Sequence, residues 1–372
     1  MKDLQKALCL LFVVVSAGLI FSCTKKAEAT SSGNKASVQL ITDASGIDDE
    51  SFNAAAWRGI LEYNGDTWEN QAGRGTTYEV VVCPSPDSYV PNIQAAVDQG
   101  YDLIFTPGFT FIAPLQEVAP KNPNQKFAIV DGDATSPINL PNVMEFFFAE
   151  EQGSYLVGVA AALQAQADGI ENPKFGFIGA IANATLTRFE MGYIQGIKSI
   201  FPNAEVLDFY TNDWAAPNLA KTQAKNWYDS GVYAIFSAAG GSGNGTIAQA
   251  KEYRIQGKNV WAIGVDSDQY KQGIYEGAKS VVLTSMLKKV DSSVLQALRA
   301  VESGATVSGS IICDLASDSV DFAETNPDLS DDIKAQVRAA KQDIISGNVA
   351  VYKTYADTLA AGLAPAGLGA KD

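Results

Sequence analysis

The fold is decided by residues 101–133, YDLIFTPGFTFIAPLQEVAPKNPNQKFAIVDGD. The runs YDLIFTPG and KFAIVDGD are short, apolar and rich in Ile, Phe and Val, which is typical of strands, and APLQEVAP between them reads as a helix. Because residues 127–130 are continuously apolar, the second strand is expected to be covered on both faces, as strands of a parallel sheet are. The stretch therefore predicts one strand–helix–strand unit of an α/β fold.

The same alternation continues in both directions along the chain. We expect strands at residues 37–43, 78–84, 142–149, 174–180, 205–211, 233–240 and 260–266, and helices at 50–63, 91–100, 151–166, 187–201, 218–231 and 245–257. Gly100 and Gly231 end two of these helices, as left-handed cap residues do. The order predicts two doubly wound α/β units, one on each side of residue 150.

The length of the chain favours two domains. A protein of 372 residues exceeds one ordinary domain. After Asp266 the alternation loosens, and the chain is expected to return to the first unit near Lys288. We therefore expect lobe 1 to comprise residues 37–147 and about 288–325, and lobe 2 to comprise residues 148–287 and about 326–372.

The first residues have the pattern of an export signal. Lys2 and Lys6 precede an apolar run at residues 7–21, which is too short to span a bilayer comfortably. The run ends in Ser22 and Cys23, which resembles the lipobox of bacterial lipoproteins. We expect residues 1–22 to be a signal peptide, Cys23 to carry a lipid, and residues 23–36 to be a polar tether. The protein would then lie on the periplasmic or extracellular face of the cell membrane; the alternative is a secreted protein cleaved by ordinary signal peptidase.

Composition excludes several classes of function. A net charge of −15 argues against nucleic acid or an anionic membrane surface as partner, because both attract basic surfaces. The absence of histidine removes Ser-His-Asp and Cys-His catalysis and the commonest zinc ligand. Of the cysteines, Cys83 and Cys313 lie in or beside strand-like runs, so two separate buried thiols are favoured, although a disulfide between them stays open.

Polar and glycine residues close several of the expected strands. Asp43, Gly108, Asp131, Gly240 and Asp266 each follow an apolar run. Each aspartate alone is more typical of a turn or a helix cap. Together they would lie at the carboxyl edges of two parallel sheets, where ligands bind in open α/β folds. The sequence therefore predicts a cleft between two lobes.

The acidic stretch TDASGIDDESFNAAAWRG, residues 42–59, precedes and begins the first expected helix. Asp48 or Asp49 is expected to cap that helix. Phe52 in the first turn is expected near the cleft, and Trp57 is expected to face the sheet. A calcium or magnesium loop fits poorly, because the alternating ligand spacing and a downstream bidentate glutamate are missing. We therefore expect no metal.

A glycine-rich turn offers a competing interpretation. In AAGGSGNGTIA, residues 238–248, Gly243, Gly245 and Ala248 match the dinucleotide fingerprint G-x-G-x-x-A, and Asp266 follows about twenty residues later. The turn lies late in the second unit, however, and an exported protein has no cytosolic NAD supply. Glycines there equally allow close approach of backbone and a small ligand. We expect no cofactor.

Seven blocks of the sequence together resemble the basic membrane protein family of substrate-binding lipoproteins, which includes purine nucleoside receptors of ABC importers. The blocks are TDASGIDDESFNAAAWRG, FAIVDGD, EEQGSYLVGVAAAL, KFGFIGA with RFEMGYIQGIK, FSAAGGSGNGT, GVDSDQ and LTSMLKKVD, between about residues 39 and 291. The resemblance implies a type I periplasmic-binding-protein fold, in which two α/β lobes close on a purine nucleoside. It also implies a monomer that docks on ABC permease and ATPase subunits, and no catalytic activity.

The resemblance assigns a role to each residue that matches the family's motifs. Asp43 follows the threonine of a Thr-Asp pair, Phe52 stacks on the base, and Asp131 is a partner of base nitrogens. Gly240 and Asp266 lie by the ribose, Lys288 contacts a hydroxyl, and Asn53 is a further candidate. The implied ligand-binding set is Asp43, Phe52, Asn53, Asp131, Trp214, Gly240, Asp266 and Lys288.

One departure from the family concerns the segment YTNDWAAPN. Trp214 stands where the family has phenylalanine, and Ala216 stands where it has aspartate. A tryptophan still stacks, so a base between Phe52 and Trp214 is expected, at roughly 1–3 kcal/mol per face. The missing carboxylate leaves the choice among nucleosides, or another small ligand, open. The rim aspartates are expected to repel phosphate, so nucleotides should bind poorly.

Two other functions remain as alternatives. A surface adhesin or signalling receptor would suit an acidic anchored protein. A hydrolase that cleaves nucleosides would need a metal or a general base among the aspartates.

Overall fold

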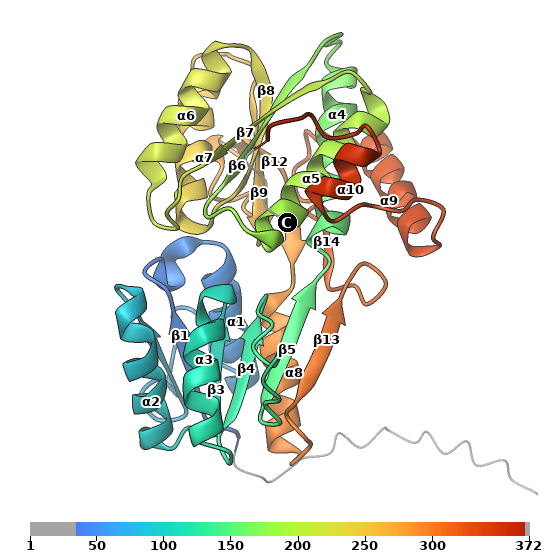
Figure 1. Ribbon diagram of the computed structural model, residues 1–372. Helices are drawn as coiled ribbons and strands as arrows, with labels where there is room; N and C mark the ends of the chain where they lie inside the picture. The colour runs from blue at the N-terminus through green and yellow to red at the C-terminus, as the bar shows by residue number, and fades with distance from the viewer. Residues whose placement is uncertain (1–34, 369–372) are drawn as a thin grey trace, which may run out of the picture. The chain divides into compact units, whose positions relative to one another are not determined.

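The computed structural model describes residues 35–368 of the chain; the expected signal peptide, Cys23 and nearly all of the expected tether lie outside the described residues. Within them the chain forms two six-stranded sheets and a small antiparallel hairpin (Figure 1). The first sheet has the order β13-β5-β4-β3-β1-β2, and all its strand pairs are parallel. Its strands are β1 (Val38–Thr42), β2 (Tyr78–Val82), β3 (Leu103–Pro107), β4 (Lys126–Val130), β5 (Val143–Phe148) and β13 (Gly309–Cys313).

The second sheet has the order β14-β12-β9-β8-β6-β7 and is parallel except for the pair β12 and β14. Its strands are β6 (Lys174–Gly179), β7 (Glu205–Tyr210), β8 (Val232–Ala238), β9 (Trp261–Asp266), β12 (Val282–Lys288) and β14 (Val320–Phe322). The hairpin joins β10 (Ile274–Glu276) to β11 (Lys279–Ser280). The predicted fold class, two α/β lobes built on parallel sheets, is confirmed.

Helices cover both faces of each sheet (Figure 1). The α-helices are α1 (Phe52–Asn64), α2 (Tyr89–Gln99), α3 (Ile112–Val118), α4 (Glu150–Ala167), α5 (Ala184–Ile200), α6 (Pro217–Asp229), α7 (Asn244–Ile255), α8 (Val290–Glu302), α9 (Asp331–Ile345) and α10 (Tyr355–Ala360). Successive strand residues point to opposite faces. In β4, accordingly, Ala128 and Val130 pack in the core with α1 and α8, whereas Phe127 and Ile129 pack with α2 and α3. This double burial explains the continuously apolar strand of the sequence.

Three connections join the two sheets. The chain passes from β5 to α4, from β12 to α8 and from β13 to β14. The expected lobe boundaries at about residues 288 and 325 stay a prediction; the short strand β14 already lies in the second sheet.

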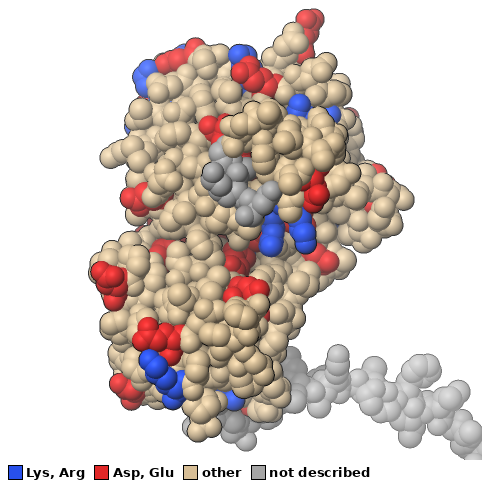
Figure 2. All heavy atoms as spheres, viewed as in Figure 1, with Lys and Arg blue, Asp and Glu red and all other residues tan. Residues whose placement is uncertain are grey.

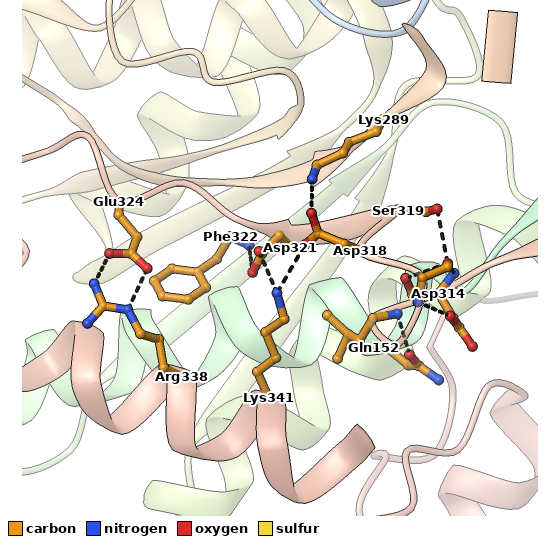
Figure 3. A network of polar contacts seen from close by, with 12 residues as sticks. Gln152, Lys289, Asp314, Asp318, Ser319, Asp321, Phe322, Glu324, Arg338 and Lys341 are labelled. Carbon is orange, nitrogen blue, oxygen red and sulfur yellow. Dashed lines mark hydrogen bonds and ion pairs between the residues drawn. The ribbon is translucent and has the colours of Figure 1, made fainter. Parts of the chain in front are cut away.

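A polar network holds these connections together (Figure 3). The Lys289 ammonium contacts Asp318 at 2.5 Å, and Lys341 of α9 contacts Asp318 at 3.3 Å and Asp321 at 2.7 Å. The backbone N–H of Leu315 donates to the side chain of Gln152 at 3.1 Å. Helix α9 therefore braces the third connection, and Gln152 ties it to the first.

Two smaller expectations, for Trp57 and for the two cysteines, are met. Trp57 is fully buried in the core and packs its ring against Tyr78. Cys83 and Cys313 are both buried and unpaired thiols. On the face shown in Figure 2, acidic and basic side chains are interspersed. Among residues 35–368, no helix is both long and apolar enough to cross a membrane.

The glycine-rich turn has a packing role. Gly245 lies in α7, where a Cβ atom would overlap the carbonyl oxygen of Pro217 and approach the backbone nitrogen of Lys221 to 2.8 Å. The nearest atom to a Cβ at Gly243 would be 3.3 Å away. The spacing that matches a dinucleotide fingerprint is thus explained at Gly245 by the close approach of α6 and α7.

We expect Gly245→Ala to lower the free energy of unfolding by about 1–3 kcal/mol, because the two helices must separate to admit the methyl group. Urea unfolding followed by circular dichroism measures the loss. Gly243→Ala is the matched control and should cost clearly less. Equal losses in the two variants would contradict a packing role specific to Gly245.

Candidate functional site

A cavity lies at the carboxyl ends of the strands of both sheets. It holds about 590 Å³ of empty space, open solvent at its mouth included. The lining residues are Asp43, Ser45, Asp49, Phe52, Asn53, Pro107, Gly108, Phe109, Thr110, Asp131, Thr185, Leu186, Phe189, Trp214, Ala238, Gly240, Val265, Asp266 and Lys288. All eight residues expected to bind ligand are among them, so the fold brings the predicted set together.

The start of α1 builds one wall of the cavity. The Asp49 carboxylate accepts hydrogen bonds from the backbone N–H groups of Ser51, Asn53 and Ala54 at 2.8–3.0 Å, so its side chain caps the start of the helix, although the N-cap position itself is Ser51. The Asn53 side-chain amide donates to Asp43 at 3.1 Å. These bonds fix Asn53 and Asp43 beside the ring of Phe52 in the first turn.

Two aspartates occupy matching positions in the two sheets. Asp131 directly follows β4 and Asp266 ends β9, and both have left-handed backbone angles, with φ of 59° and 61°. Such angles are uncommon outside glycine and are often found at functional sites. The Asp266 carboxylate accepts a hydrogen bond from the Ser51 hydroxyl of the other lobe at 2.5 Å.

Lys288 supplies the positive charge of the cavity. Its side chain is only 1% exposed, and its ammonium lies 2.5 Å from Asp131 and 2.8 Å from Glu150. The rings of Phe52, Phe148 and Phe189 surround it, with centroids 4.9–5.3 Å away. Burial lowers the pKa of Lys288, but the surrounding carboxylates outweigh this effect and raise it above its ordinary value.

Burial also governs the acids of the cavity. It raises the pKa of Asp49 to about 7, against the effect of the backbone N–H donors. It raises the pKa of Asp131 to about 7, although Lys288 opposes the rise. Burial likewise raises the pKa values of Asp43 and Asp266. The cavity is therefore a poorly solvated site in which carboxylates gain from any donor that a ligand provides.

Aromatic rings line both sides of the cavity. Phe52 comes from the first lobe and Trp214 from the second. The ring of Trp214 packs at a tilt against Phe109, with centroids 6.2 Å apart, and lies so close to Gly240 that a Cβ there would be 3.3 Å from it. Gly240 has a φ of 52°, so a glycine here allows the left-handed backbone of the turn and also leaves room for the Trp214 ring.

Three polar atoms of the predicted site are buried without a hydrogen-bond partner. They are Oδ1 of Asn53, Oδ1 of Asp131 and Nε1 of Trp214. A buried polar group without a partner costs about 1–3 kcal/mol. Residues that line the cavity thus hold two acceptors and one donor without a partner.

Several contacts between the two lobes around the cavity come from one segment of the first lobe, residues 45–58. The Ser45 hydroxyl donates to the Trp214 carbonyl at 3.2 Å, and the Gln269 amide donates to the Glu50 carbonyl at 3.2 Å. The Arg58 guanidinium donates to the Ser267 hydroxyl at 2.7 Å. The acidic stretch 42–59 of the sequence is therefore the surface on which the second lobe closes.

Sequence reasoning missed several residues of the site. Phe109 directly follows the predicted strand end at Gly108, a signal that was available. The α5 residues Thr185, Leu186 and Phe189 line the cavity because that helix begins beside the end of β6, as sheet topology could have indicated.

Within the described chain, no group of three or more His, Cys, Asp or Glu side chains is arranged to hold a metal ion.

Comparison with known proteins is consistent with this geometry. The family model described as ABC transporter substrate-binding protein PnrA-like matches residues 36–355. A CD4+ T-cell-stimulating antigen of Listeria innocua is 34% identical over 364 residues, which cover 94% of this chain and 99% of that protein. The ABC transporter nucleoside-binding protein BmpA of Lactococcus lactis is 33% identical over 320 residues, covering 84% of this chain and 88% of that protein.

Solved structures agree on the fold. An ABC transporter solute-binding protein from Aeropyrum pernix K1 matches with a TM-score of 0.74 and 25% sequence identity, covering 88% of this chain and 98% of that one. The predicted periplasmic-binding-protein fold is thereby confirmed.

Proposed function

Since this chain belongs to the PnrA-like family of ABC transporter substrate-binding proteins, we propose that its ligand is a purine nucleoside of the adenosine, guanosine and inosine class. The family consists of binding proteins rather than enzymes, which confirms the prediction of a protein without catalytic activity and sets aside the hydrolase alternative. The proposal therefore concerns which solute is captured and how it is delivered.

The observation that carries the proposal is the pairing of aromatic rings with unsatisfied polar atoms in one cavity. Phe52 and Trp214 offer apolar faces for a flat base. Oδ1 of Asn53 and Oδ1 of Asp131 lack donors, which the N–H groups of a purine would supply. The Asp266 carboxylate is suited to accept hydrogen bonds from vicinal ribose hydroxyls.

The ligand is expected to be a free nucleoside rather than a nucleotide. Among the residues that line the cavity, four are aspartates and Lys288 alone is basic, and Lys288 already contacts two carboxylates. A phosphate would meet repulsion in a poorly solvated site. The relative from Lactococcus lactis, whose name describes it as nucleoside-binding, supports the same ligand class.

Delivery would follow from closure of the lobes. A nucleoside held between them stabilises the closed form by contacting both, and the closed form then docks as a monomer on an ABC permease with its ATPase.

We propose that Cys23 carries the lipid that keeps the protein on the periplasmic or extracellular face of the membrane. Metabolic labelling with a radioactive or alkyne-tagged fatty acid would label the wild type and leave Cys23→Ser unlabelled; equal labelling would contradict the anchor.

Calorimetric titration with adenosine, guanosine and inosine tests the ligand class. Heat of binding with at least one of them is expected, together with much weaker binding of the 5′-monophosphate. No heat and no thermal shift with any of the three nucleosides would end the proposal.

Phe52→Ala should weaken nucleoside binding at least about tenfold, because it removes a stacking face worth roughly 1–3 kcal/mol. Phe52→Leu keeps an apolar side chain but no ring, and should recover little of the loss. Calorimetry on both variants measures the effect. Affinity like that of the wild type in Phe52→Ala would mean that the base lies elsewhere.

The remaining alternative is a surface adhesin or signalling receptor. Adjacent genes for an ATPase and permeases would favour import. Binding of the protein to a cell surface, without any bound small molecule, would favour the alternative. The cavity with its unsatisfied polar atoms favours capture of a small molecule.

A further inference from the structure

Glu150 is a buried carboxylate that contacts the site without lining the cavity. It is 0% exposed and is the first residue of α4. Its Oε1 accepts a hydrogen bond from the Lys288 ammonium at 2.8 Å, and its Oε2 lies 3.4 Å from the guanidinium of Arg188. It begins the block EEQGSYLVGVAAAL, but nothing in that block indicated its contact with Lys288, which is 138 residues away.

Both members of this pair lie at connections between the sheets. Glu150 begins α4 directly after the passage from β5, and Lys288 is the last residue of β12 before the passage to α8. The third connection touches the first, since the backbone N–H of Ala149 donates to the carbonyl of Cys313 at 2.9 Å. The lysine is therefore held from the side of the connections by Glu150 and from the cavity side by Asp131.

We propose that Glu150 is a positioning residue for ligand binding: it fixes the Lys288 ammonium at the connections between the lobes and, by sharing that positive charge, sets how much of it acts on Asp131. This inference rests on the proposed function only in the choice of ligand. The ion pairs themselves join Glu150, Lys288 and Asp131 of this chain. Among the described residues, these three form a buried chain of ion pairs from the connections to the cavity wall.

The physical consequence concerns the protonation of Asp131. One ammonium lies within 3 Å of two carboxylates, so each carboxylate reduces the stabilisation that the other receives. Burial raises the pKa of Asp131 to about 7, Lys288 lowers it, and the negative charge of Glu150 raises it again. When the negative charge of Glu150 is removed, Lys288 pairs with Asp131 alone. Asp131 would then ionise at lower pH.

The state of Asp131 matters to a ligand because its Oδ1 has no partner in the cavity. An ionised carboxylate accepts hydrogen bonds from ligand N–H groups more strongly than a protonated one. Other charged or titratable groups also act on this cluster. They are Glu151 of α4, Asp266 of β9, Arg188 of α5 and the thiol of Cys313 in β13; Arg58 of α1 acts on Asp266.

The test compares Glu150→Gln with Glu151→Gln. Both substitutions remove a buried carboxylate from the first turn of α4, but of these two carboxylates only that of Glu150 pairs with Lys288. The protein, labelled with ¹³C at aspartate carboxyl groups, is titrated by NMR without ligand. The Asp131 signal is identified by its loss in Asp131→Asn.

We expect the Asp131 titration midpoint to fall by about half a pH unit or more in Glu150→Gln. Glu151→Gln should move it clearly less, and Glu150→Asp should restore it in part. An unchanged or raised midpoint in Glu150→Gln, or an equal shift in Glu151→Gln, would overturn the role of Glu150.

A second arm measures inosine binding by calorimetry between pH 5.5 and 8.5. The acidic limb of the affinity profile should move to lower pH in Glu150→Gln, in step with the NMR midpoint. If the wild type binds no nucleoside, the proposed function fails, whereas the NMR titration still decides the role of Glu150. If the wild type binds and neither the limb nor the midpoint moves, the inference alone fails.

Discussion

Replacing Lys288 by methionine is expected to lower the free energy of unfolding by about 3–5 kcal/mol near pH 8. Methionine fills much of the same space among the rings of Phe52, Phe148 and Phe189, so the loss reports charge more than volume. The substitution leaves Asp131 and Glu150 buried without their shared cation. A buried carboxylate without a partner carries most of its desolvation penalty uncompensated.

The loss should shrink as the pH falls toward 5. Without the cation, the folded-state pKa of Asp131 rises further above its unfolded value of about 4. An acid with a raised folded pKa favours the folded state below its unfolded pKa, and this contribution disappears as the pH rises through the folded pKa. The variant should therefore be relatively more stable at pH 5, where Asp131 can stay protonated in the fold, than at pH 8.

Urea unfolding of wild type and variant at pH 5, 6.5 and 8 measures this dependence. Lys289→Met is the matched control, because the neighbouring lysine is 34% exposed and pairs with the exposed Asp318 (Figure 3). An exposed pair contributes about 1 kcal/mol or less, with little change over this pH range. Similar losses in the two variants, or a loss in Lys288→Met that does not depend on pH, would contradict a central role for the buried cation.

Much of this site could be predicted because parallel strands end at a common edge. Asp43, Asp131, Gly240 and Asp266 all lie at strand ends, and a strand is recognisable from local composition. Once the strands were placed, the topology required these residues to converge, and they all line the cavity. Phe52 and Asn53 followed from the recognisable start of a helix.

What the sequence did not reveal depends on long-range packing. The contact of Glu150 with Lys288 joins positions that share no periodic pattern, so the block that Glu150 begins did not indicate this contact. The tilt that pairs Trp214 with Phe109 depends on how one lobe meets the other. The short antiparallel strand β14 has only three residues, too few for a reliable pattern.

The glycine-rich turn shows how a local motif misleads. Its spacing matched a nucleotide fingerprint, yet Gly245 is required where α7 crosses close to the backbone of α6. A glycine at a helix start allows a phosphate to approach the backbone, and it equally allows a second helix to pack closely. Only the neighbouring helix, which the motif does not include, distinguishes the two.

Asp266→Asn is expected to weaken inosine binding by roughly 10- to 100-fold, because hydrogen bonds to an ionised acceptor contribute about 1.5–3 kcal/mol and the amide retains only part of this. Asparagine tolerates the left-handed backbone at this position, where φ is 61°. Its side-chain oxygen can still accept the hydrogen bond from the Ser51 hydroxyl. The substitution therefore removes charge while it preserves the backbone and the contact between the lobes.

Titration of both proteins with inosine and 2′-deoxyinosine locates the contact. If the Asp266 carboxylate accepts the vicinal ribose hydroxyls, the wild type prefers inosine, and Asp266→Asn loses most of that preference. Ser51→Ala removes the contact between the lobes without altering the charge, so it should weaken both ligands by the same smaller factor. Equal losses for the two nucleosides in Asp266→Asn would mean that this aspartate acts through lobe closure, and the ribose would then have to bind elsewhere in the cavity.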